Sequence, residues 1–138
     1  MAEELATTTY LVSEPFELAV KSLRKALADG NLKVAGELDM SCRIRQRLLI
    51  STAPCRVLFV AATPAAFEEL GADPCAAALT PLHIVVSARG SQTEIHLLRA
   101  LPAHNTSLDQ PTMEVFRRLQ ARIAQAVERI GMRSVFGG

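Results

Sequence analysis

The chain has 138 residues, of which 49% are hydrophobic and 21% charged, as in one ordinary globular domain. Its formal net charge of +1, with one Tyr, five Phe and no Trp, argues against a nucleic-acid partner, because such partners are held by clustered positive charge and by base stacking. The longest apolar run, residues 57–62, is far shorter than the roughly 18 residues of a membrane span, so we expect no membrane association.

The N-terminal segment and the cysteines narrow the class of protein further. Residues 1–5 are acidic and lack the basic and apolar regions of a secretion signal, which predicts a cytoplasmic protein. Cys42, Cys55 and Cys75 do not have zinc-site or thioredoxin-like spacing, so we expect structural cysteines and no cofactor. We expect a single domain over residues 1–138, with mobile tails at residues 1–6 and 132–138.

The first 40 residues predict a strand, a helix and a second strand. Residues 7–12 are β-branched and aromatic, as is typical of a strand. Ser13 and Pro15 indicate a helix start capped by the serine, and we expect Gly30 to end the helix in the left-handed conformation. The helix has an apolar stripe formed by Phe16, Val20, Leu23 and Leu27.

Residues 32–40 alternate between apolar and polar side chains, which predicts a half-buried strand. Leu32, Val34, Leu38 and Met40 would share one face of it. Gly36 in its middle indicates a β-bulge or a close approach of another backbone.

Residues 41–50 have two interpretations. As a strand, the segment places Arg43, Arg45 and Arg47 on one face; as a helix, it is capped by Asp39 or Ser41, and we favour the helix. The three arginines are a candidate anion-binding site, because guanidinium groups suit carboxylate and phosphate. The alternative is a solvated face, which is the usual place of arginine.

The second half predicts one interior strand, short helices, a hairpin and a last helix. Residues 57–62 are apolar on both faces, so this strand should be covered on two sides. Thr63-Pro64 and Asp73-Pro74 indicate two short helices. The last helix follows Ser107 or Asp109, with an apolar stripe of Phe116, Leu119, Ile123, Val127 and Ile130. The order β-α-β-(α)-β-α-β-β-α predicts an α+β fold, a mainly antiparallel sheet with helices packed on one face.

Residues 82–99 predict a β-hairpin that carries two of the three histidines. Pairing Ile84 with Leu97 and Val86 with Ile95 puts the apolar side chains on one face, and it closes the hairpin around Gly90-Ser91. Val85 then lies opposite His96, and Ser87 lies opposite Glu94. His83, Glu94 and His96 share the outward face, with His83 diagonal to His96.

This outward face has two interpretations. His83, His96 and Glu94 could form a transition-metal or acid–base site, since two imidazoles and a carboxylate can converge there. The simpler interpretation is a face that meets water or a second subunit. We expect a homodimer, because the strand at residues 57–62 is apolar on both sides whereas the helices cover one.

The chain resembles a known family in several short stretches. They are Gly30-Asn31-Leu32-Lys33-Val34, residues 57–66 (VLFVAATPAA), residues 79–86 (LTPLHIVV) and the turn at Gly90. The family is the domain-of-unknown-function 302 family. The resemblance implies a small bacterial or archaeal α+β domain that tends to dimerise, without an established activity or an agreed active site.

The leading hypothesis is therefore a non-enzymatic homodimeric module that binds a small ligand or a protein partner. The alternative is an enzyme or metal-binding protein that uses His83, His96 and Glu94. A third class is an anion-binding protein that uses Arg43, Arg45 and Arg47.

Overall fold

The computed structural model describes residues 7–41, 53–70, 82–98 and 110–134. Its elements, in chain order, are β1 (Thr7–Val12), α1 (Phe16–Asp29), β2 (Leu32–Asp39), β3 (Cys55–Ala62), α3 (Pro64–Leu70), β4 (Leu82–Arg89), β5 (Gln92–Leu98), α4 (Gln110–Glu128) and β6 (Met132–Arg133). No described helix is both long enough and apolar enough to span a membrane.

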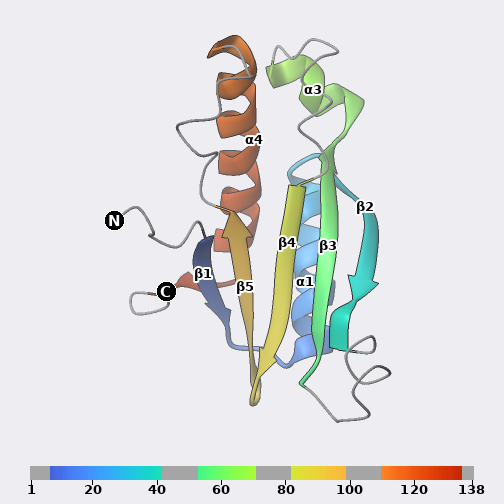
Figure 1. Cartoon of the computed structure of the whole chain (residues 1–138), viewed down its shortest axis with the longest axis vertical. Coiled ribbons are helices and arrows are strands. Elements are labelled where there is room, and N and C mark those ends of the chain that lie inside the picture. The colour runs from blue at the N-terminus through green and yellow to red at the C-terminus, as the bar shows by residue number, and fades with distance from the viewer. Residues whose placement is uncertain (1–6, 42–52, 71–81, 99–109, 135–138) are drawn as a thin grey trace.

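The strands form one six-stranded sheet in the order β2-β3-β4-β5-β1-β6, and every neighbouring pair is antiparallel. In this order β1 and β2 run in the same direction, so the chain between them needs a crossover, which α1 provides. In Figure 1, α1 lies behind the sheet, and the lower part of α4 lies on the same side while its upper part extends beyond the ends of β4 and β5. The predicted α+β fold, with helices on one face of an antiparallel sheet, is confirmed.

The hydrophobic core lies between this face and the two helices. Ile84, Val86 and Ile95 are completely buried, and Leu97 is 6% exposed. Ile84 pairs with Leu97 and Val86 with Ile95, and Arg89 pairs with Gln92 around the two-residue turn, where Gly90 has a φ of 63°. The predicted register of the hairpin is thus confirmed, including the glycine in the positive-φ position.

Helix α1 differs from the prediction at both of its ends. Its N-cap is Pro15, without a side-chain cap, whereas Ser13 was the expected cap. The segment before the helix is fixed instead by β5, because the Glu14 carbonyl accepts a 2.8 Å hydrogen bond from the buried Thr93 hydroxyl. At the other end Asn31, not Gly30, has the left-handed conformation, with a φ of 61°. Asparagine tolerates this region because its short polar side chain can hydrogen-bond locally.

Strand β2 contains the bulge that Gly36 indicated, and the bulge corrects the predicted faces. Val34 pairs with Val60, but Gly36 pairs with Phe59, so one extra residue lies between the two pairs. Beyond this point every side chain changes face. Leu38 therefore lies opposite Val57, on the face away from the helices, and does not share a face with Val34.

Several predictions fall on residues that the structure does not describe. Met40 and Ser41 are helical, but the rest of the predicted helix at 41–50, with Arg43, Arg45 and Arg47, lies outside the described residues. The same holds for Cys42, Cys75 and the second short helix. The first short helix is α3, where the hydroxyl of Thr63 accepts a hydrogen bond from the Ala66 N–H. Residues 132 and 133, expected in a C-terminal tail, form β6.

Tyr10 joins β1 to α4 and predicts a pH-dependent stability. Its hydroxyl donates a 3.1 Å hydrogen bond to Glu128 Oε2, and burial, followed by this carboxylate, raises the pKa of Tyr10 above its ordinary value of 10.0. A raised pKa in the folded state means that its stabilisation is present below pH 10 and is lost as the pH rises through the folded pKa.

Because Tyr10 is the only tyrosine, phenolate absorbance reports on it alone. We expect the phenol to ionise at higher pH in folded than in unfolded protein. In the Tyr10→Phe variant, the free energy of unfolding should decrease less at alkaline pH than it does in the wild type. Equal phenol titration in folded and unfolded protein would contradict the contact.

Candidate functional site on the open face of the sheet

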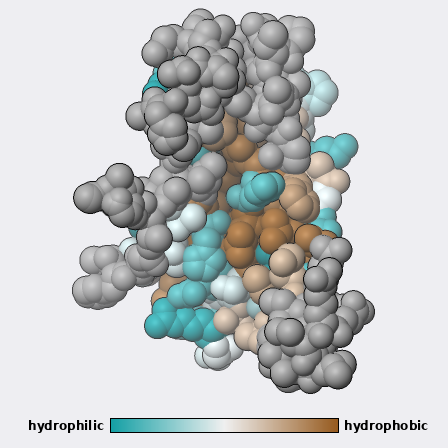
Figure 2. Space-filling model, in the orientation of Figure 1, coloured by the Kyte–Doolittle hydropathy of each residue, from teal (hydrophilic) through white to brown (hydrophobic). Residues whose placement is uncertain are grey.

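The face of the sheet away from α1 and α4, called the open face from here on, faces the viewer in Figures 1 and 2. The strand pairings place its side chains in rows across the strands. One row contains Leu38, Val57, Val85, His96 and Thr9. The next contains Cys55, Ser87, Glu94, Leu11 and Met132.

The part of the open face over β3 and β4 is apolar. Figure 2 shows hydrophobic residues gathered there, and Val57, Phe59 and Val85 are half-buried although neither long helix covers them. His83 extends this area, because its ring meets Phe59 edge-on, with a centroid distance of 5.2 Å and an interplanar angle of 85°. Aromatic pairs favour this geometry. His83 is therefore part of an apolar contact.

The part of the open face over β4, β5 and β1 is polar and is centred on His96. Its Nδ1 lies 3.0 Å from Thr9 Oγ1, and its Nε2 lies 3.3 Å from Ser87 Oγ. Glu94 Oε1 is 3.7 Å from the same Nε2, while Glu94 Oε2 accepts a 2.8 Å hydrogen bond from Arg89. We call these five residues the His96 cluster.

The chemistry open to the His96 cluster is limited by its own hydrogen bonds. An imidazole beside a serine hydroxyl and a carboxylate has the components of a general base and a nucleophile. Here both ring nitrogens already lie at hydrogen-bond distance from hydroxyl groups of the chain. A substrate would have to displace Ser87 to reach Nε2, so the geometry favours a structural polar cluster over an acid–base site.

The predicted trio is only partly brought together. All three side chains lie on the open face, and Glu94 and His96 are neighbours, but His83 packs against Phe59. Among the residues that the structure describes, no group of three or more His, Cys, Asp and Glu could hold a metal ion. The register explains why His83 does not join the other two residues. His83 and His96 occupy diagonal positions, and the ring of His83 packs against Phe59 on β3.

Two features of the site were not in the sequence prediction. Thr9 was missed because nothing in the sequence indicates that β1 pairs with β5. Cys55 also lies on the open face, where burial and then the Asp39 carboxylate raise the pKa of its thiol. A raised pKa leaves little thiolate at neutral pH, which agrees with a structural cysteine.

This architecture, an antiparallel sheet with helices on one face and an open second face, also occurs in a known family of proteins. The family model described as "Domain of unknown function DUF302" matches residues 8–130, so the chain belongs to this family. A solved structure, an uncharacterised conserved DUF302 protein from Bacillus stearothermophilus, is similar with a TM-score of 0.75 at 17% identity. The match covers 92% of this chain and 99% of that one, and it shows a shared fold. A search of curated proteins finds no match.

The His96 cluster predicts different effects for two threonines on one face of β1. Thr9 is 5% exposed and contacts His96, whereas Thr7 is exposed. Thr9→Val leaves a half-buried ring nitrogen without its partner, which should lower the free energy of unfolding by about 1–2 kcal/mol.

Thr7→Val is the matched control, with an expected change within about 0.5 kcal/mol. Urea unfolding of both variants measures the difference. Equal effects would show that the contact between Thr9 and His96 contributes nothing to stability.

Proposed function

We propose that this chain is a non-enzymatic binding module that acts as a homodimer, with a second copy packed on the open face. The observation that carries the proposal is the two-sided apolar character of β3. Leu58 and Val60 are completely buried against the helices, while Val57 and Phe59 point the other way and stay half-buried. Apolar area of this kind favours a partner, because its removal from water contributes about 25 cal/mol per Å².

The size of the open face supports a partner as large as a second copy. Five neighbouring strands, at about 4.8 Å spacing and roughly seven residues of about 3.3 Å each, present on the order of 600 Å². Two such faces together give about 1,200 Å², the lower end of specific protein interfaces. Met132, 78% exposed at the end of one row, adds a flexible apolar side chain.

The polar half of the face is compatible with burial. Buried polar groups are costly only when they lack hydrogen-bond partners. Within the His96 cluster, His96 contacts Thr9 and Ser87, and Glu94 contacts Arg89. A second copy therefore need not supply partners for them, and the cluster can set the orientation of the two sheets.

An enzymatic role for His83, His96 and Glu94 is the second candidate. The distance of 3.3 Å between Ser87 Oγ and His96 Nε2 is the observation in its favour. His83 packs against Phe59 and lies apart from Glu94 and His96, so the enzymatic role is the weaker proposal.

A charge in the centre of the open face tests the dimer. Val85 lies opposite both Val57 and His96, so Val85→Asp places a carboxylate in the middle of the interface. An unpaired buried charge costs several kcal/mol, and we expect the dimer dissociation constant to rise by about 100-fold or more. Sedimentation equilibrium should give twice the 14.9 kDa of one chain for the wild type, and one chain for the variant.

Leu18→Asp is the matched control, because Leu18 is a 51% exposed apolar residue on α1, away from the open face. Its mass should equal that of the wild type, and circular dichroism should show that both variants are folded. A wild-type mass of one chain across micromolar concentrations, or equal dissociation of both variants, would overturn the proposal.

A further inference from the structure

A second surface feature lies on the helix side of the sheet, away from the open face. Arg56 on β3 pairs with Val86, whose side chain is buried in the core, so Arg56 points towards α1. There it borders a hollow of about 410 Å³, which is within the range of small-molecule sites. The lining residues are Glu17, Leu18, Val20, Lys21, Arg24 and Arg56.

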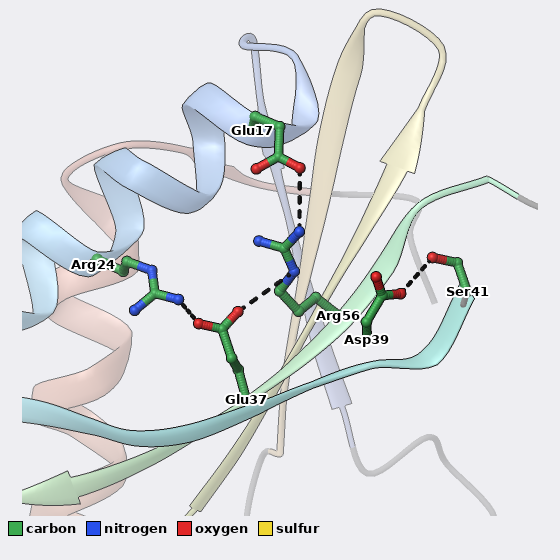
Figure 3. A network of polar contacts seen from close by, with 6 residues as sticks. All are labelled: Glu17, Arg24, Glu37, Asp39, Ser41 and Arg56. Atoms are coloured by element: carbon green, nitrogen blue, oxygen red, sulfur yellow. Dashed lines mark hydrogen bonds and ion pairs between the residues drawn. The ribbon is translucent and has the colours of Figure 1, made fainter. Parts of the chain in front are cut away.

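Arg56 is held in one orientation by three neighbours. Its Nε lies 3.5 Å from Glu37 Oε1, its Nη2 lies 3.2 Å from Glu17 Oε2, and its guanidinium lies 5.1 Å from the centroid of the Phe16 ring. Figure 3 shows Arg56 between the two carboxylates, with Arg24 pairing with Glu37 from the other side. A guanidinium ordered in this way loses little entropy when it binds an anion.

The two carboxylates around Arg56 are not equivalent. Glu37 is 35% exposed and is shared by two arginines, whereas Glu17 is 77% exposed and, among the described residues, forms an ion pair with Arg56 only. Ion pairs as exposed as that of Glu17 contribute little, typically a factor of less than about five in an equilibrium constant. Glu17 therefore fills a carboxylate position from which a stronger ligand can displace it.

The rest of the hollow specifies what such a ligand needs. Lys21 borders the hollow and makes no ion pair with any described residue, so it offers a second cation. Leu18 is one of two large hydrophobic residues that are exposed in the described part of the chain, and it lies beside these cations. Positive charge next to bare apolar surface matches an acid with an apolar tail.

We propose that this hollow binds the carboxylate of a small amphipathic acid. The ligand carboxylate replaces Glu17 as the partner of Arg56 and forms an additional ion pair with Lys21. The aliphatic part of the ligand packs on Leu18. This site is separate from the open face, so the proposal does not rest on the homodimer.

Hexanoate is the probe, titrated into the full chain and followed by the amide shifts of α1. Glu17→Gln removes the competing carboxylate and should tighten binding about two- to fivefold. Arg56→Gln should weaken it at least about tenfold, since it removes a charge-assisted hydrogen bond. Arg117→Gln, at an exposed arginine on α4 that lines neither the hollow nor the open face, is the matched control and should bind as the wild type does.

Two further probes separate the parts of the ligand. Hexanol has the aliphatic tail but no carboxylate, and inorganic phosphate is an anion without a tail. Both should bind at least about tenfold more weakly than hexanoate. The proposal is overturned if Glu17→Gln binds no tighter than the wild type, or if hexanol binds as well as hexanoate. Because Glu17 is exposed, its variant keeps the test valid even if Arg56→Gln fails to fold.

Discussion

The register of the β4–β5 hairpin is the constraint on which the rest of the structure depends. Side chains alternate between the two faces of a strand, so a shift by one residue would exchange every inward residue for an outward one. The pairs Ile84–Leu97 and Val86–Ile95 place four aliphatic side chains under α1 and α4. The same register places Ser87, Glu94 and His96 on the open face. Core and candidate site are thus two consequences of one set of hydrogen bonds.

The long helices cover only one face of this sheet, and the open face is the result. Its composition is divided, with an apolar area around Val57, Phe59 and Val85 beside the His96 cluster. Because the polar residues have partners within the chain, they can be buried without a large desolvation cost. An apolar area favours contact with a partner, and the ordered polar residues beside it can determine how the two sheets are oriented. The homodimer proposal rests on this combination.

The sequence was most informative where a short-range pattern determines the structure. The alternation in residues 82–98 and the Gly90 turn predicted the register, and they placed His83, Glu94 and His96 on the outward face. Long-range pairing was less accessible. The contact of Thr9 with His96 depends on β1 lying beside β5, and the position of Leu38 depends on a bulge that changes faces. The hollow at Arg56 was not predicted, since it requires residues of α1 to meet Arg56 on β3.

The most direct test of the central claim is whether the open face is shielded from solvent in the native protein. A soluble paramagnetic agent broadens methyl signals that it can approach. At protein concentrations well above the dimer dissociation constant, the Val57 and Val85 methyl groups should stay sharp while those of Leu18 broaden. In the Val85→Asp variant the Val57 methyl groups should broaden as well. Broadening of Val57 and Leu18 to the same extent in the wild type would contradict the claim that a second copy covers the open face.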